Sequence, residues 1–463
     1  MKRVMTMAIL IVLALFWDAG RPASAQFSPD AIRLPPVETA VLANGIRLFY
    51  IRDELPQVTV MASIGFGKLY EKKENAGISD VIAKAISLGG SVNYPGSVLH
   101  EKVDAMGGRL SVESSWEGTV ISLKVLERFR GEAFAIVADL VASPVFDQRS
   151  LDTAKGLVAD SIRRKYDDPA EIAFDRVRDI IFGGEGYGSS PTPEKVAAYT
   201  IEDVKGVWEK YRAGRNIMIG ISSSIGFAEA GRLCRERFSA IAPGGDMAYT
   251  ADRESIRARV KASRGKIYFY PKDIPQSTVI VGTVAPEISY GGGYALEIMN
   301  FILGGGSFNS RLMTEIRVKR GLAYAVQSIL KLRSGTGVFL AFAQVENRTL
   351  GEALGLLNEN IDRISHEKIS GAEMEWARKA ITNSFVFQFD TPMNVLSNYL
   401  FIAYNNLPPD YFTGYLGRIN GVRDGEVLAE TAKLFEPGLV TVVVGNESVL
   451  PDLKKFGEVV IIK

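Results

Sequence analysis

Arg317 and Tyr324 lie close together in the sequence and carry side chains that could act on the same carbonyl group. A guanidinium and a phenol are both hydrogen-bond donors, and both suit a carbonyl oxygen or the oxyanion that it becomes during nucleophilic attack. A basic helix end followed by glycine and an aromatic strand residue is also ordinary protein construction. These two residues alone therefore define a candidate site and do not establish one.

A helix that turns directly into a strand would position these two donors. Leu312 and Ile316 have the i, i+4 spacing of one apolar helix face. Gly321 supplies the left-handed residue at which helices commonly end. We therefore expect Arg317 at the end of a helix and Tyr324 in the strand that follows. The tight turn between them could bring both side chains to the same side.

Length, charge and cysteine content limit the class of protein. The chain has 463 residues, of which 47% are hydrophobic, so it is long enough for two or three domains with substantial cores. The formal net charge is +1 and no basic block is present, so we expect no nucleic-acid partner. Cys234 is the only cysteine, which excludes an internal disulfide and gives no sign of a thiolate metal site.

The first residues predict a signal peptide over residues 1–25. Basic residues are followed by the apolar run Ile9–Phe16, and Ala23–Ala25 provides small residues at a cleavage site. We therefore expect cleavage after Ala25 and export, to a bacterial periplasm. No later run is long and apolar enough to span a membrane, so we expect no transmembrane segment in the mature chain.

The order of the expected elements restarts part-way along the chain. Residues 241–264 are rich in Gly, Pro and charge and lack a clean period, and we interpret them as a linker between domains at 26–240 and 265–463. Asp53–Val60 parallels Asp273–Val279 in sequence, which favours an internal duplication. The expected fold class is α+β, with two homologous α/β-sandwich halves. Each half would be a mixed, largely antiparallel sheet with helices packed on it.

Hydrophobic periodicity indicates where the long helices lie. Asp167–Pro169 separates two of them, at 148–166 and 170–182. Helices are expected at 74–88, 98–106, 128–141, 148–166, 170–182, 201–211, 227–238, 294–303, 350–364, 371–387, 395–404 and 425–435.

Several short motifs occur along the chain in a characteristic order and spacing. They are Leu42–Ile46, Asn75–Ser79, Met106–Leu110, Ser143–Phe146 and Asp167–Pro169 in the first half, and Gly304–Ser307, Ser310–Leu312 and Glu315–Tyr324 in the second. In this order they resemble the pitrilysin/insulinase family, the inverted zinc peptidases that include the mitochondrial processing peptidase. The resemblance covers nearly all of the mature chain. It implies two halves that face each other as a clamshell.

The family's zinc-site positions have lost their functional groups in this chain. Active members bind zinc through an H-x-x-E-H motif on the first helix and a glutamate from a later helix. Here the motif positions fall on Asp80, Ala83 and Lys84, and the later ligand falls on or near Ala154. Ala83 can neither bind a metal nor act as a base, while Asp80 and Lys84 have the spacing of a helix ion pair. We therefore expect this chain to bind no catalytic zinc.

The histidines offer little prospect of a replacement site. His100 and His366 are the only two, one in each half, and neither has a second histidine nearby in sequence. A surface or structural role is the simpler expectation for both. A self-sufficient peptidase with an unusual metal site is therefore disfavoured, although tight, stoichiometric zinc in the purified chain would revive it.

The resemblance has the opposite implication for the second half. In active family members an arginine and a tyrosine of the C-terminal half hold the substrate carbonyl opposite the zinc, and their spacing matches Arg317 and Tyr324. In this family the zinc and the Arg/Tyr pair can sit on two different chains. The resemblance thus implies the non-zinc subunit of an exported heterodimeric zinc metalloendopeptidase, inactive alone. Zinc would come from an H-x-x-E-H partner subunit, and unfolded peptide would be the substrate.

The alternative is a catalytically inactive member of the same family. Such a protein would bind peptides or serve a structural role, and it would require no particular geometry of Arg317 and Tyr324. Substitution of Arg317 distinguishes the two hypotheses, because it would be silent in the inactive protein.

Overall fold

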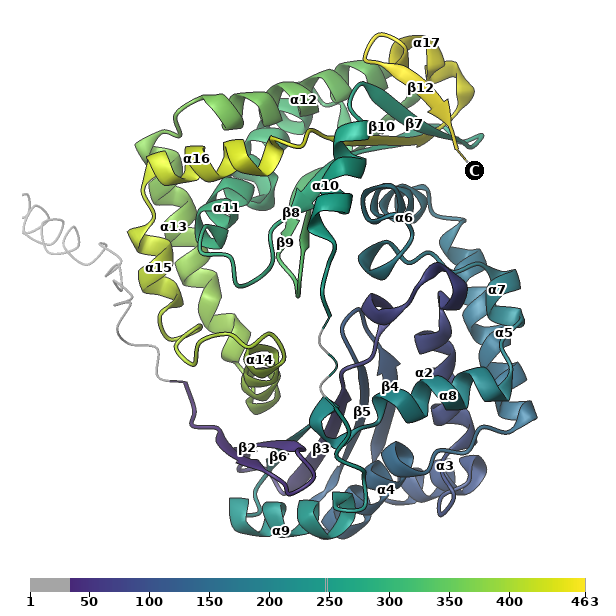
Figure 1. Ribbon diagram of the computed structural model, residues 1–463. Coiled ribbons are helices and arrows are strands. Elements are labelled where there is room, and N and C mark those ends of the chain that lie inside the picture. Colours follow the sequence, from purple (N-terminus) through teal and green to yellow (C-terminus); the bar gives the residue numbers. More distant parts are fainter. Residues whose placement is uncertain (1–33, 246, 248, 463) are drawn as a thin grey trace, which may run out of the picture. The chain divides into compact units, whose positions relative to one another are not determined.

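The computed structural model describes residues 34–245, 247 and 249–462. The signal peptide expected at residues 1–25 lies outside these residues. The described chain contains two six-stranded mixed sheets, each with helices packed on it (Figure 1). Within these residues, no helix is long and apolar enough to cross a membrane.

The sheet of the first half has the strand order β1-β2-β6-β3-β5-β4. Its strands are β1 (Glu38–Val41), β2 (Arg47–Arg52), β3 (Gln57–Ile64), β4 (Arg109–Ser114), β5 (Thr119–Leu126) and β6 (Ile217–Ser223). β2 and β6 are parallel, and all other neighbouring strands are antiparallel. β3 and β6 are buried almost throughout, which explains their continuous apolar sequences.

The sheet of the second half has the strand order β12-β7-β11-β8-β10-β9. Its strands are β7 (Lys266–Pro271), β8 (Gln276–Ala285), β9 (Ala323–Lys331), β10 (Gly337–Glu346), β11 (Val440–Gly445) and β12 (Glu458–Ile461). The run β7-β11-β8-β10-β9 repeats β2-β6-β3-β5-β4, including the parallel pair at its start. The expected α+β fold with two homologous halves is therefore confirmed. The halves differ in the sixth strand, because β1 is antiparallel to β2 and β12 is parallel to β7.

The long helices expected from periodicity are present and have identifiable starts. Thr200, for example, begins α8 with a capping box in which its side chain and that of Asp203 bond each other's backbone nitrogens. The first half contains α2 (Ile78–Gly89), α3 (Gly96–Ala105), α4 (Arg130–Ala142), α5 (Gln148–Lys165), α6 (Pro169–Phe182), α7 (Pro193–Ala197), α8 (Ile201–Tyr211) and α9 (Phe227–Phe238). The second contains α11 (Gly293–Asn300), α12 (Leu350–His366), α13 (Gly371–Phe385), α14 (Pro392–Tyr404), α15 (Tyr415–Gly421), α16 (Asp424–Phe435) and α17 (Leu450–Leu453).

One helix from each half packs on the sheet of the other half (Figure 1). α6 packs on β8 and β11, where Val177 lies in one apolar cluster with Ile280 and Val442. α14 packs on β2 and β6, where Leu396 lies in one cluster with Met218. These clusters occupy sheet faces opposite those covered by each half's own helices. Each sheet is therefore buried on both faces only when both halves are present.

The segment interpreted as a linker contains a helix. Residues 241–264 include α10 (Arg253–Ala262), which begins at Asp252, whose side chain accepts a hydrogen bond from the Ser255 nitrogen. Ile256 and Val260 are buried, and α10 packs on α6 and β8. Two apolar residues amid charged ones gave too weak a period to predict this helix. The segment joins the halves as part of the packed structure.

Candidate functional site

The positions at which the sequence analysis expected the zinc motif lie together on α2. Asp80, Ala83 and Lys84 line a hollow of about 280 Å³, to which β4 contributes Glu113 and α5 contributes Ser161. The remaining face of α2 is apolar and buried, and the helix packs on both β4 and α5. The hollow thus joins the first helix to a later helix, as the resemblance implies for a zinc site.

Asp80 is neutralised by a lysine that the motif does not include. The Lys68 ammonium lies 3.0 Å from Asp80 Oδ2 and 5.9 Å from the centre of the Trp116 ring. The ion pair expected between Asp80 and Lys84 is wrong, because Lys68 reaches Asp80 from a short helical turn before α2 while Lys84 is exposed to solvent. Two ammonium groups therefore line the hollow, and both would repel a divalent cation.

The later-ligand position expected at Ala154 also needs a correction. Ala154 is fully buried in the core of the first half and does not line the hollow. Ser161, further along α5, does line it, together with Leu157. Residues seven apart lie on nearly the same helix face, so spacing alone did not separate Ala154 from Ser161. Ser161 therefore occupies the position on α5 from which a glutamate side chain could face α2.

A buried carboxylate that the sequence analysis missed holds the start of α2. Glu71 accepts hydrogen bonds from the backbone nitrogens of Gly77 and Ser79, at 2.9 and 3.0 Å. It also accepts from the hydroxyls of Ser79 and Ser189, at 2.6 and 2.8 Å. Burial raises the pKa of the Glu71 carboxyl, and these hydrogen bonds act in the opposite direction. Glu71 positions α2, and it lies outside the lining of the hollow.

The donor set at the hollow does not fit a zinc ion. It consists of Asp80 paired with one lysine, a second lysine, Glu113 and two serines, with no histidine or cysteine among them. The histidines lie elsewhere: His100 contacts the Ser87 carbonyl oxygen and His366 the Asp362 carbonyl oxygen, each at 3.0 Å. Within the described residues, no group of three or more His, Cys, Asp or Glu side chains is arranged to hold a metal ion.

The stretch that carries Arg317 winds more widely than expected. Met313–Val318 forms a π-helix rather than an α-helix, with the Lys319 nitrogen bonded to the Thr314 carbonyl oxygen. Ile316 is fully buried, as expected from the apolar spacing, and Gly321 ends the turn at φ +66°. Because the hydrogen bonds of a π-helix span five residues in place of four, its side chains point in different directions from those of an α-helix, and such turns are frequent at functional sites.

Three cationic side chains lie at this helix end, and two of them are paired with a carboxylate. Glu315 accepts hydrogen bonds from Lys319, at 2.6 Å, and from Arg320, at 2.9 Å. These two hydrogen bonds lower the pKa of Glu315. The Arg317 guanidinium lies 5.7 Å from the centre of the Phe308 ring, and within the described chain no carboxylate pairs with it. Of the three, Arg317 is therefore the cation left available for another acceptor.

The Tyr324 hydroxyl is also free to bond to an acceptor outside the described chain. Its side chain is 76% exposed and forms no hydrogen bond with the rest of the described chain. It lies near the start of β9, the edge strand of its sheet. Arg317 and Tyr324 thus present a guanidinium and a phenol on either side of the turn at Gly321.

An ion pair that the sequence analysis missed fixes the start of this stretch. Arg311 donates to both carboxylate oxygens of Glu373 on α13, at 2.8 and 3.1 Å. Glu373 also accepts from Ser370, with which it forms a capping box. Partial burial would raise the pKa of Glu373, but the hydrogen bonds from Arg311 and Ser370 prevail and hold it at about 2. The pair connects the helix of Arg317 to α13.

Comparisons with known proteins identify the family of this chain. The family described as "Insulinase (Peptidase family M16)" matches residues 47–192, and "Peptidase M16 inactive domain" matches residues 198–381. The chain belongs to peptidase family M16. The pitrilysin/insulinase resemblance drawn from the sequence is therefore confirmed.

Relatives in the family are distant in sequence but similar in fold. Uncharacterized zinc proteases of Rickettsia felis and Bacillus subtilis are 23% and 22% identical, over 74% and 76% of this chain and 82% and 85% of the relatives. A structure from Pseudomonas fluorescens, described as a peptidase M16 inactive domain, has a TM-score of 0.78 at 19% identity, covering 89% of this chain and 98% of that one. The periplasmic protease PqqL from Escherichia coli has a TM-score of 0.73 at 14% identity, over 94% of this chain and 50% of that one.

Proposed function

We propose that this chain is the non-zinc subunit of an exported heterodimeric zinc metallopeptidase. A partner of the same family with an intact H-x-x-E-H motif would supply the zinc, its ligands and the general base. This chain would supply Arg317 and Tyr324 to the carbonyl group of the scissile peptide bond. The expected signal peptide and the similarity of fold to a periplasmic protease support export.

The observation that carries the proposal is the contrast between the two halves. In the first half, Asp80 is paired with Lys68, and Ala83 occupies the position at which the resemblance implies a general base. In the second half, Arg317 and Tyr324 keep the spacing of the family motif and have no competing partners among the described residues. A protein that had lost all function at this site would be free to lose or to pair these donors.

The chemistry assigned to this chain is stabilisation of negative charge. When a water activated by the partner attacks the peptide carbonyl carbon, the carbonyl π electrons move onto the oxygen. Hydrogen bonds from Arg317 and Tyr324 would strengthen as this oxyanion forms, which lowers the barrier selectively. Loss of one such donor typically costs about 10²–10³ in rate.

Two edge strands support a peptide as the substrate. β4 lies beside the hollow at α2, and β9 carries Tyr324; each is the last strand of its sheet. Unpaired backbone groups at a sheet edge can bind an extended peptide as an added strand. We infer that β4 and β9 are the candidate edges.

The second candidate function is a peptide-binding or structural protein without catalysis. The solved structure from Pseudomonas fluorescens, described as an inactive domain, favours this alternative. Both candidate functions interpret the first half of the chain in the same way. It differs only in giving Arg317 and Tyr324 no role in bond cleavage.

Reconstitution tests the proposal. The mature chain, an exported H-x-x-E-H family member from the same cell and a mixture of the two are assayed for cleavage of unfolded peptides. We expect a stable complex, with cleavage by the mixture that exceeds the sum of the separate chains and is lost on chelation. A complex without gain of activity would favour the structural alternative. Absence of both association and activity would contradict a heterodimer with that member.

A further inference from the structure

A cavity of about 740 Å³ in the second half lies apart from the residues considered so far. It is bounded by α11, α13, α14, α15 and the end of β9, together with the loop before α15. Neither Arg317 nor Tyr324 lines it. Its volume suits a small organic ligand or one long side chain of a peptide.

Aromatic rings form a continuous wall of this cavity. Their centres lie between 4.5 and 6.5 Å from one another in successive pairs. The rings belong to Tyr294, Phe385, Phe401, Tyr411, Phe412 and Tyr415. Aromatic faces carry partial negative charge, so an enclosure of this kind attracts organic cations as well as apolar groups.

A carboxylate lies among these rings without a counter-ion. Glu297 on α11 lines the cavity and accepts a hydrogen bond from the Tyr415 hydroxyl. Among the described residues, no cationic side chain pairs with it. Burial raises the pKa of Glu297, and the hydrogen bond from Tyr415 only partly offsets this effect. A buried carboxylate in this state is stabilised by any cation that enters.

A second acceptor lies on the same helix. Asn300 also lines the cavity, and its side-chain oxygen is buried without a hydrogen-bond partner in the described chain. Glu297 and Asn300 have the i, i+3 spacing that places side chains on one helix face. Buried polar atoms are normally hydrogen-bonded, so an unpartnered acceptor beside a carboxylate indicates a missing donor.

Other charged groups near α11 are already bonded to other groups or are exposed to solvent. Arg418 lines the cavity, pairs with Asp410 and donates to the Tyr411 carbonyl oxygen, and its guanidinium lies 6.0 Å from the centre of the Tyr294 ring. On α16, Glu430 pairs with Lys433 and accepts from Tyr290; on α13, Arg378 donates to the Val422 carbonyl oxygen. Lys331 of β9 is exposed. Glu297 therefore remains the carboxyl of the interior that has no cationic partner among the described residues.

We propose that this cavity binds an organic cation that carries N–H groups, either a guanidinium or an alkylammonium. Its charged end lies against Glu297 and Asn300, and its hydrocarbon part lies against the aromatic wall. The two acceptors select for N–H donors, and the rings select for a cation over a neutral polar group. The proposal goes beyond the peptidase role and does not depend on it.

A π-helical turn forms part of the cavity wall. The helix that begins as α11 continues as the π-helix Phe301–Gly305, and both Phe301 and Gly305 line the cavity. A π-helical turn is wider than an α-helical one and is commonly retained for function. By strand order, α11 is the counterpart of α2, so the duplication gives the two halves different pockets at related places.

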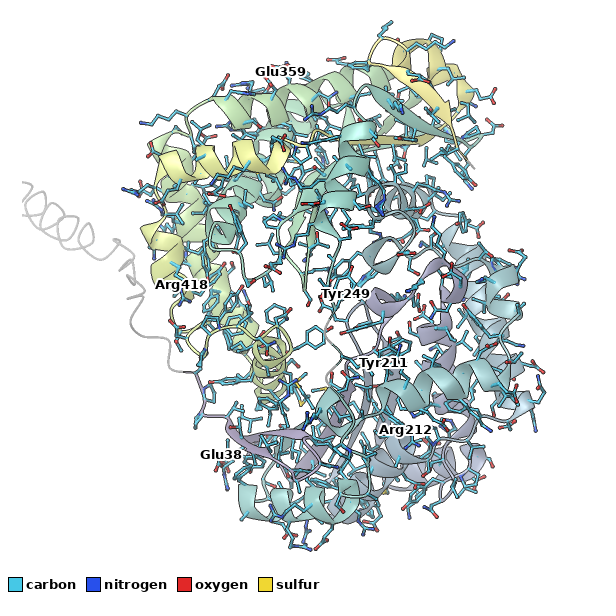
Figure 2. All side chains as sticks on the ribbon, in the orientation of Figure 1. Glu38, Tyr211, Arg212, Tyr249, Glu359 and Arg418 are labelled. Atoms are coloured by element: carbon cyan, nitrogen blue, oxygen red, sulfur yellow. The ribbon has the colours of Figure 1, made fainter. Side chains whose placement is uncertain are left out.

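Isothermal titration calorimetry of the mature chain with agmatine tests the proposal. We expect one site per chain, with affinity reduced at least about ten-fold in Glu297→Gln. This variant should fold, because it replaces a buried carboxyl by a neutral amide of similar size. Glu359→Gln is the matched control, since Glu359 lies on α12 outside the cavity (Figure 2). Equal affinity in wild type and Glu297→Gln, or no binding of agmatine at all, would overturn the proposal.

The pH dependence of agmatine binding gives a second readout on the unmutated chain. The guanidinium stays protonated throughout the working range, whereas Glu297 must be ionised to pair with it. Because the empty cavity raises the pKa of Glu297, we expect binding to weaken as the pH falls and to release protons from the chain. Affinity that is independent of pH between 8 and about 4, near the ordinary pKa of a glutamate, would contradict the role of Glu297.

Three further ligands define the chemistry and the source of the cation. Choline lacks N–H donors and is expected to bind more weakly than agmatine; equal binding would refute the role of Asn300.

A peptide with one arginine is compared with the same peptide carrying neutral citrulline. A preference for the arginine peptide over agmatine identifies a peptide side chain as the ligand, and the reverse identifies a free small molecule. Equal binding of the citrulline peptide would contradict a cation site.

Discussion

At Ala83 and Lys84, two ordinary side chains replace the base and one ligand that zinc chemistry would require on α2. Asp80 keeps an oxygen that could bind a metal, but Lys68 holds it at 3.0 Å. The motif spacing assigned the wrong partner to Asp80 and the wrong residue of α5. Both errors arose because the sequence does not show which residues from other elements converge on α2.

Restoring the ligands tests whether the hollow at α2 is a former zinc site. The variant Asp80→His/Ala83→Glu/Lys84→His/Ser161→Glu is expected to bind zinc tightly, because two imidazoles and a carboxylate then face one hollow. Bound zinc is measured after dialysis by elemental analysis.

The matched control carries Ala154→Glu in place of Ser161→Glu. Ala154 is buried away from the hollow, so this variant should retain less zinc and should melt at a lower temperature because a carboxylate replaces a core methyl group. Equal zinc in both variants would contradict the assignment of Ser161.

At the scale of elements, the regular parts of the fold follow from sequence and the irregular parts do not. α8 was predictable because Thr200 and Asp203 cap an amphipathic run. The π-helices at 301–305 and 313–318 were not, since their composition suits an α-helix and only packing decides the winding. α10 was not predicted, because only two of its residues are buried. The cavity around Glu297 was also invisible, because its wall comes from several helices.

The ion pair between Arg311 and Glu373 is expected to hold the helix of Arg317 onto α13. Arg311→Met should destabilise the fold by about 1–3 kcal/mol, the cost of removing charge-assisted hydrogen bonds from a partly buried carboxylate. Arg363→Met, which breaks the exposed pair with Glu367, should change stability by less than about 1 kcal/mol. Chemical denaturation at neutral pH measures both, and equal effects would contradict the assigned role.

The same pair makes a prediction about pH. The pKa of Glu373 is lowered in the folded chain to about 2, so its contribution to stability is present above its ordinary pKa of about 4.5 and is lost as the pH falls toward 2. Arg311→Met should therefore lose less stability than wild type between pH 5 and 2.5. Parallel curves for the two proteins would contradict this linkage.

At the scale of the whole molecule, the two homologous halves complete each other's cores. α6 covers a face of the second sheet and α14 covers a face of the first, so neither half buries its sheet alone. The duplication was visible in the sequence as an echo around Asp53 and Asp273. The exchange of helices was not, because an apolar helix face does not indicate which sheet it contacts.

Separate expression of residues 26–240 and 265–463 tests this dependence. Without α6, buried residues such as Val440 and Val442 become exposed, and we expect each half alone to aggregate or to lack a cooperative melting transition. Co-expression should restore a soluble complex with near-native melting. Two halves that each melt cooperatively, near the temperature of the intact chain, would contradict the exchange as a source of stability.

The most direct test of the central claim compares Arg317→Ala with Arg320→Ala in the reconstituted pair of subunits. Both changes remove a cation from the same helix end, but Arg320 is already paired with Glu315 whereas Arg317 is not. We predict that kcat/KM for peptide cleavage falls about 10²–10³-fold with Arg317→Ala and changes little with Arg320→Ala, while association with the zinc-bearing partner is unchanged for both. Full activity of the Arg317→Ala complex would contradict a split active site and leave this chain a non-catalytic subunit.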